Sequence, residues 1–256
     1  MFSFLKRRRR MRLLTTPFPP AWNEHLATNF PQFATLPEPL QLRLRDRLRI
    51  FHAEKYWEGV GGFEVTEEMQ VVVAAMACTL TLAFDEAEAV FPKVLTVLIH
   101  GETYSRRAQN HVGGGVIDER QEWRLGEAWH RGPVALSWPA VVEGGRNPSD
   151  GQNLVYHEFA HALDMTGGIA DGVPPVGDEQ AERNWTAVFH REFEQLHASW
   201  SSGLGLPIDP YALTNEAELF SVATENYFER PRLLKIKLPR LYELLDSFYR
   251  LGPAEW

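Results

Sequence analysis

The 256-residue chain contains a single cysteine, Cys78. One cysteine cannot form an intrachain disulfide, so a disulfide-stabilised secreted scaffold is excluded. Zinc fingers, iron–sulfur clusters and CxxC redox centres are excluded as well, because each of them needs more than one thiolate. A lone thiol is typical of a reducing compartment, and we therefore expect a cytoplasmic protein.

Long apolar runs are also missing. The most apolar stretch, 71–84, is interrupted by Thr79 and Thr81 and is bounded by charged residues, whereas a membrane-spanning helix needs about 20 consecutive apolar residues. The run that follows Arg12 is too short and too rich in proline for the apolar region of a signal peptide. The sequence therefore predicts no transmembrane segment.

Acidic residues are absent from the first twelve positions, which hold six of the 26 basic residues of the chain. The remainder carries 20 basic against 34 acidic residues, a net charge of −14. Such an acidic body argues against direct binding of nucleic acid. We expect 1–12 to be a disordered, solvated basic tail, with weak attraction to anionic lipid or nucleic acid as the functional alternative.

The patterning of the remaining residues predicts one mainly helical α+β domain over 13–256, with a sheet-containing part to about 150 and a helical part over 151–256. The apolar runs 94–100 and 133–142 predict strands, and Pro139 places the second at the edge of a small mixed sheet, lining a cleft. A turn and a short strand are expected within 110–119. Helices are predicted over 22–29, 40–58, 66–84, 151–165 (with Asp150 as N-cap), 178–200, 214–228 and 239–250.

The chemistry is carried by the motif His157-Glu158-Phe159-Ala160-His161, an H-E-x-x-H pattern inside the helix predicted over 151–165. Histidines at i and i+4 lie one above the other on a helix, so both imidazoles can bind one Zn²⁺. Glu158 is then placed to act as general base toward a water activated by the metal. The alternative is a helix with two histidines that are exposed or satisfied within the core.

A catalytic zinc usually has three protein ligands, so a third must come from elsewhere in the chain. Asp164 and Gly167 occupy the positions where the longer metzincin motif has glycine and histidine, which excludes that class. On the helix predicted over 214–228, Glu218 and Glu225 share one face and are both geometric candidates. Glu218 also fits the third position of a capping box behind Asn215.

Together with the residues that surround it, this motif resembles the Mlc titration factor A family of zinc-dependent peptidases. The resemblance rests on the segment from His157 to Met165, the Gly-rich run 167–175, the segment 130–138, and Tyr211 followed seven residues later by Glu218. The family is of the gluzincin type and is related in fold to the catalytic domain of anthrax lethal factor. The resemblance therefore implies a zincin-like metallopeptidase fold over about residues 14–250.

The resemblance also implies roles for individual residues. His157, His161 and Glu218 would be the ligands of one Zn²⁺ per chain, Glu158 the general base, and Tyr211 a group that assists the transition state. Glu225 then becomes a structural acid behind a ligand. Asp164 has three interpretations: it supports a ligand imidazole, it holds the loop that follows, or it is a surface acid at the end of the helix.

Two classes of function follow. The first is an aminopeptidase-like zinc peptidase acting on peptide substrates, and the presence of Glu158 favours it, because a structural zinc site has no use for a general base. The second is a protein that binds a transcriptional repressor of the Mlc type, with little peptidase activity or with activity gated by that partner. No closed four-ligand zinc site is evident in the sequence.

Overall fold

The structure is a computed structural model that describes residues 2–85, 90–102 and 133–256. The turn and strand expected within 110–119, and the part of 130–138 that precedes Pro133, lie outside the described residues. The elements of the N-terminal half are α1 (Phe2–Thr15), α2 (Pro20–Asn29), α3 (Glu38–Glu54), β1 (Tyr56–Gly59), α4 (Glu67–Leu80), β2 (Thr96–His100) and β3 (Val134–Ser137). Those of the C-terminal half are α7 (Trp138–Arg146), α8 (Leu154–Asp164), α9 (Glu179–Ser201), α10 (Glu216–Glu229), α11 (Pro231–Lys237) and α12 (Pro239–Tyr249).

The expected α+β architecture, mainly helical with a small sheet, is confirmed. The three described strands form one sheet in the order β1-β2-β3. Both pairs are parallel, so the antiparallel pairing that a mixed sheet requires is absent among the described strands. Parallel neighbours need a crossover, and α4 lies in the one that joins β1 to β2.

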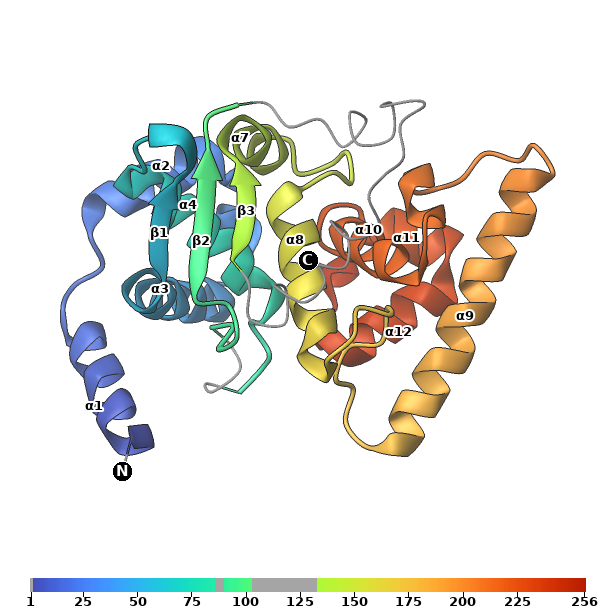
Figure 1. Ribbon diagram of the computed structural model, residues 1–256, viewed down its shortest axis with the longest axis horizontal. Coiled ribbons are helices and arrows are strands. Elements are labelled where there is room, and N and C mark those ends of the chain that lie inside the picture. Colours follow the sequence, from blue (N-terminus) through green and yellow to red (C-terminus); the bar gives the residue numbers. More distant parts are fainter. Residues whose placement is uncertain (1, 86–89, 103–132) are drawn as a thin grey trace.

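Helix α8 occupies the centre of the molecule, between the sheet and the C-terminal helices (Figure 1). It contacts β3 on one side and α10 on the other, and α4 also packs against it. Its apolar residues, among them Val155, Phe159 and Ala160, are fully buried. The predicted motif therefore lies on a helix that is held from several sides, which restricts how its side chains can move.

The strand predicted over 133–142 is correct only for its first part. Val134–Ser137 forms β3, at the edge of the three described strands, but residues from Trp138 onward form helix α7. Pro139 stands in the first turn of this helix. Proline is favourable there because the first helical N–H groups have no partner within the helix. A residue interpreted as a sign of an edge strand is thus a sign of a helix start.

We expected a disordered basic tail over 1–12, and the structure instead shows a helix in the described part of that segment. Phe2–Thr15 forms helix α1, which packs against α3. Arg10 is buried and makes two hydrogen bonds of 2.8 Å to the two carboxylate oxygens of Glu54. Composition could not reveal this, because the pairing residue lies 44 positions away. Within the described residues, no helix combines the length and apolar character that a bilayer-crossing segment needs.

Candidate metal centre

The start of α8 is set by Asn153, whose side-chain oxygen accepts a hydrogen bond of 3.1 Å from the backbone N–H of Tyr156. The expected N-cap, Asp150, instead accepts a hydrogen bond from Gln152 N in the preceding loop. The helix therefore begins a few residues later than predicted, at Leu154. This start places His157, which is almost fully buried, in the first turns of the helix.

Helix α10 begins at Glu216, two residues later than the predicted 214, directly after Asn215. The side chain of Asn215 caps it and accepts a hydrogen bond of 2.9 Å from Glu218 N. Glu218 thus occupies the third position of the capping motif, but its carboxylate points toward the histidines of α8. The Glu218 N–H thus completes the Asn215 half of a capping box, whereas the side chain, which a full capping box directs back to the N-cap N–H, joins the centre.

The side chains of His157, His161 and Glu218 converge on one point. The Nε2 atoms of the two histidines are 3.2 Å apart. Oε2 of Glu218 lies 3.0 Å from His157 Nε2 and 3.4 Å from His161 Nε2. Among the described residues, these three form the group of histidine, cysteine and acidic side chains that could hold a metal ion.

Three observations indicate that a cation fits this place. Oε2 of Glu218 is buried and has no hydrogen bond, although two imidazoles lie within 3.4 Å. A tetrahedral zinc ion with bonds of about 2.0–2.1 Å holds its ligands about 3.3 Å apart, close to the three separations found here. Two imidazole nitrogens and one carboxylate oxygen are also a donor set that suits zinc. The residues present therefore fit a zinc ion.

The pKa of Glu218 also reflects this arrangement. Burial acts to raise the pKa of this carboxyl, but the imidazoles of His157 and His161 beside it have the larger combined effect and lower it below its ordinary value. Glu218 is therefore a carboxylate at neutral pH, which is the form that binds metal.

Glu225 lies behind the centre, about two turns after Glu218 on the same face of α10. Its Oε1 atom is 2.7 Å from Nδ1 of His157, and its Oε2 atom accepts a hydrogen bond of 2.5 Å from Asn153 N. The carboxylate is completely buried. A carboxylate acceptor at Nδ1 favours the tautomer that carries its proton there, which leaves the lone pair of Nε2 directed at Glu218 and His161. Of the two acids left open by spacing, Glu218 thus enters the centre and Glu225 contacts a histidine from behind.

Two further residues of this network were not anticipated from the sequence. Asn153 donates through its side-chain amide to Glu229 Oε1 at 3.1 Å, and Glu229 Oε2 accepts from Gly151 N at 3.1 Å. Burial, with Glu225 nearby as an added effect, raises the pKa of Glu229 to about 8. The available signal was spacing, because Glu229 stands four residues after Glu225 and so on the same helical face.

The remaining predicted residues lie around the centre. Glu158 is half-buried on α8. The ring of Tyr211, which belongs to a short 3₁₀ helix over Pro210–Leu213, has its centroid 6.0 Å from that of His157. Asp164 is fully buried, so the interpretation as a surface acid is wrong; its Oδ2 accepts a hydrogen bond from Gly172 N at 2.9 Å and holds the following loop. The roles of all these residues in catalysis stay predictions.

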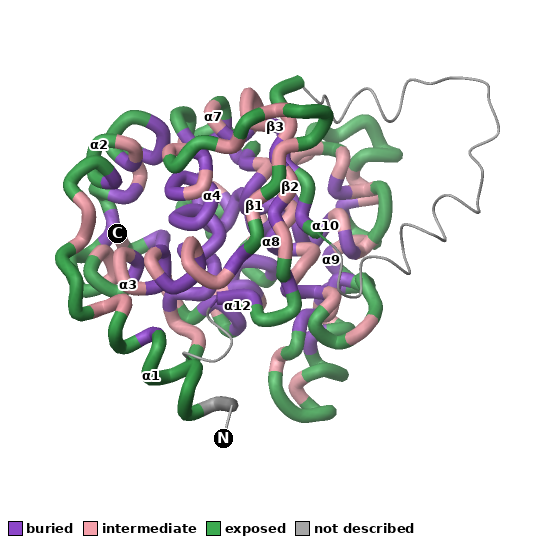
Figure 2. Tube along the Cα trace, turned by 60° about the vertical axis from the view of Figure 1, so that its left-hand side comes forward, coloured by how far each residue is buried: buried purple, intermediate pink, exposed green. Residues whose placement is uncertain are grey.

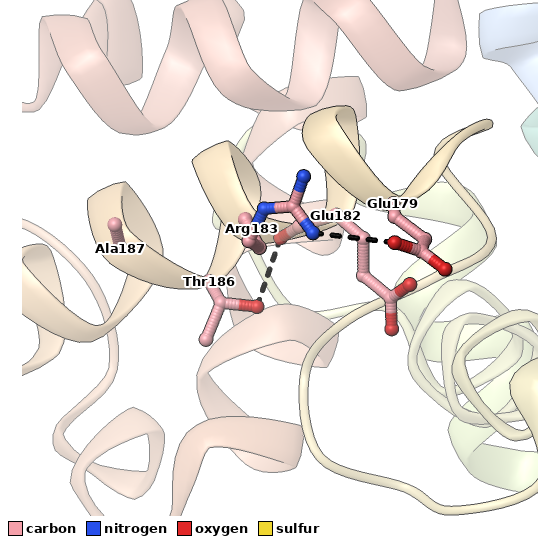
Figure 3. Close-up of a pocket in the computed structure, with 5 residues that line it drawn as sticks. All are labelled: Glu179, Glu182, Arg183, Thr186 and Ala187. Atoms are coloured by element: carbon pink, nitrogen blue, oxygen red, sulfur yellow. Dashed lines mark hydrogen bonds and ion pairs between the residues drawn. The ribbon is translucent and has the colours of Figure 1, made fainter.

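A shallow surface hollow lies elsewhere, along the first turns of α9, and contains none of the residues named above (Figure 3). Its side chains are Glu179, Glu182, Arg183, Thr186 and Ala187. Arg183 pairs with Glu179 at 3.4 Å, one helical turn away. An exposed pair of this kind contributes little to stability, and these residues offer no convergent set of ligand atoms.

The chain is similar along most of its length to known proteins. The family described as glucose-regulated metallo-peptidase M90 matches residues 4–250. The protein slr2042 of Synechocystis sp. is 33% identical over 246 residues, which cover 96% of this chain and 89% of the relative. Mlc titration factor A of Yersinia pestis (strain Pestoides F) is 31% identical over 233 residues, which cover 90% of this chain and 84% of the relative. These similarities extend across both the sheet and the helices that carry the candidate ligands.

Proposed function

The chain belongs to the family of glucose-regulated metallopeptidases M90, and from this premise we propose that it is a zinc-dependent, aminopeptidase-like enzyme that uses Glu158 as general base. The observation that carries the proposal is the convergence of His157 Nε2, His161 Nε2 and Glu218 Oε2 within 3.4 Å of one another. Family membership supplies the reaction class, amide hydrolysis, and the donor set supports zinc.

In this proposal His157, His161 and Glu218 hold the metal. When bound, zinc supplies Lewis acidity, which lowers the pKa of water and polarises a carbonyl oxygen. The carboxylate of Glu158, which follows the first ligand on α8, accepts the proton of the attacking water and returns it to the nitrogen of the leaving amine. Glu225 keeps the His157 imidazole in the tautomer whose Nε2 faces the ligands.

Tyr211 and β3 complete the proposed mechanism. The Tyr211 ring lies beside the His157 imidazole, and we assign its hydroxyl to hydrogen bonding with the oxygen that gains negative charge in the transition state. Strand β3 contacts α8 and lies at the edge of the three described strands, so it is our candidate for pairing with the backbone of a peptide substrate. A cytoplasmic location remains our expectation, from the single cysteine.

The central experiment compares the wild type with Glu158→Gln, which keeps the shape of the side chain and removes the base. Elemental analysis of both proteins is combined with hydrolysis of chromogenic aminoacyl and short-peptide substrates. We expect about one zinc ion per chain in both proteins, with turnover in the wild type alone. Glu182→Gln, a charge-matched change in the exposed hollow on α9, should leave turnover unchanged.

Two results would contradict the proposal. Absence of zinc from the wild type, even after incubation with the metal, would show that His157, His161 and Glu218 are not zinc ligands. Equal turnover by the wild type and Glu158→Gln would show that Glu158 is not the general base. For Tyr211→Phe we expect kcat to fall about 100-fold with little change in KM, which is typical for the loss of one donor to a developing oxyanion.

A repressor partner is the second candidate, and the name of the Yersinia relatives, Mlc titration factor A, favours it. The measurement is titration of this chain against a purified repressor of the Mlc type. Zinc in both proteins but no turnover in either, together with saturable repressor binding, would favour a binding protein or a partner-gated enzyme. Failure to bind the repressor, with peptide turnover present, would leave the peptidase as the whole function.

A further inference from the structure

Helix α1 lies at one end of the molecule (Figure 1) and packs against α3. Arg10 faces inward and pairs with both carboxylate oxygens of Glu54 at 2.8 Å, while Lys6 lies 3.4 Å from the same carboxylate. Arg49 of α3 adds a hydrogen bond to Thr16 O, just after the end of α1. The helix is therefore fixed in place on the body although almost all of its other residues face solvent.

The outward side of α1 combines positive charge with large apolar groups. Nearly the whole tube of this helix is coloured as exposed, with one buried segment (Figure 2). Three apolar side chains are exposed although each would be expected to pack in a core: Phe4 (69%), Leu5 (57%) and Met11 (58%). Five basic side chains of the helix are exposed as well, Lys6, Arg7, Arg8, Arg9 and Arg12, of which Lys6 and Arg9 also contact the body. No acidic residue is present in the helix.

We propose that this face of α1 is a docking surface for an anionic lipid bilayer. Each basic residue near such a surface raises the partition coefficient by about fivefold, because the phosphate headgroups carry negative charge. Outside 1–12 the chain carries a net charge of −14, which a negatively charged membrane repels. The molecule therefore approaches an anionic surface with α1 foremost, and Phe4, Leu5 and Met11 enter the headgroup layer.

The apolar residues favour lipid over nucleic acid as the occupant. Phosphate backbones attract arginine as strongly as lipid headgroups do, but they offer no apolar layer for Phe4, Leu5 and Met11 to enter. A second copy of the chain is the other source of negative charge, since its body is acidic. An acidic protein surface attracts the arginines but again leaves the three apolar side chains in water.

The experiment is co-sedimentation of the full chain with vesicles of phosphatidylcholine mixed with phosphatidylglycerol, against vesicles of phosphatidylcholine alone. We expect binding to the anionic vesicles only, weakening as salt is raised, because the screening length shrinks. The triple variant Arg7→Gln, Arg8→Gln, Arg12→Gln should lower the partition coefficient by about 100-fold, from about fivefold per residue. The matched control, Arg183→Gln, Arg191→Gln, Lys237→Gln, removes the same charge from exposed positions on α9 and α11 and should bind like the wild type.

A second triple variant, Phe4→Ser, Leu5→Ser, Met11→Ser, distinguishes binding to lipid from binding to nucleic acid or to a second copy of the chain. It should weaken vesicle binding severalfold and leave any binding of duplex RNA unchanged. If the arginine variant of α1 and the control variant of α9 and α11 lost vesicle binding equally, the proposal would be overturned, because the net charge of the protein, and not the position of the charges on α1, would then determine binding. Wild-type binding to RNA but not to anionic vesicles, or self-association abolished by the arginine variant without vesicle binding, would overturn it as well. Peptide hydrolysis in solution should be the same in all of these variants, so this test is independent of the proposed catalytic centre.

Discussion

Replacement of Glu225 by glutamine should weaken zinc binding although this residue does not belong to the three candidate ligands. In the structure, one carboxylate oxygen of Glu225 faces His157 Nδ1 at 2.7 Å and the other accepts from Asn153 N at 2.5 Å. Both partners are donors when His157 presents the lone pair of Nε2 to the centre. Glutamine has one acceptor oxygen, so its NH₂ group must face one of the two donors.

The outcome depends on the tautomer of His157. If the glutamine oxygen stays on Asn153 N, its NH₂ group can be satisfied only when His157 Nδ1 loses its proton. The proton then sits on Nε2, and that nitrogen cannot bind zinc. If the oxygen stays on His157, the buried Asn153 N–H loses its acceptor, at a cost of about 1–3 kcal/mol. Changes behind a metal-binding histidine typically reduce metal affinity about 10–100-fold, or about 1.4–2.7 kcal/mol.

The assay is zinc affinity from competition with a chromophoric chelator, with folding checked by circular dichroism in the metal-free state. The control is Glu216→Gln on the same helix, where a half-buried carboxylate pairs with Nδ1 of the exposed His190 at 2.6 Å and is not among the candidate ligands. Nitrogen-15 spectra of the histidine rings report the tautomer of His157 directly. A folded Glu225→Gln protein with the zinc affinity of Glu216→Gln would refute the positioning role of Glu225.

Three further outcomes are expected. Asn153→Ala should lower the free energy of unfolding by at least about 1–2 kcal/mol in urea, because the cap of α8 is lost and buried Glu229 loses a donor. Asp150→Ala should stay within about 0.5 kcal/mol, and the reverse order would show that the helix start is misassigned. Burial raises the pKa of Asp164 from 3.8 to about 6 in the folded chain. Between these two values the folded chain keeps a proton that the unfolded chain has released, so the free energy of unfolding falls by about 3 kcal/mol as pH rises from about 4 to 6. In metal-free protein, Asp164→Asn should therefore gain up to about 3 kcal/mol above pH 6 and nothing near pH 4, and a gain independent of pH would contradict this cause. Zinc at 100 times its dissociation constant should add about 2.7 kcal/mol to the free energy of unfolding, and His161→Ala should abolish that increment.

Local sequence patterns predicted the helices well where the cause is itself local. Thr66, Asp178 and Asn215 each accept a hydrogen bond from a backbone N–H at the start of the helix that they were expected to open. The error at Pro139 arose because proline is compatible with both an edge strand and a helix start. Packing of the following residues against neighbouring elements selects between the two, and that is not a local property.

The spacing of His157 and His161 was enough to place both imidazoles on one side of a helix, because i and i+4 positions coincide on any α-helix. Glu158 beside the first histidine also led the sequence to predict a metallopeptidase, a class that the family match supports, while the role of Glu158 as general base stays a prediction. It left Glu218 and Glu225 as equal candidates on geometry, since both lie on the same face of α10. Only the packing of α10 against α8 decided that Glu218 meets the two Nε2 atoms while Glu225 meets Nδ1 from behind. The same holds for α1, whose buried Arg10 pairs with Glu54, a residue close in space and far along the chain.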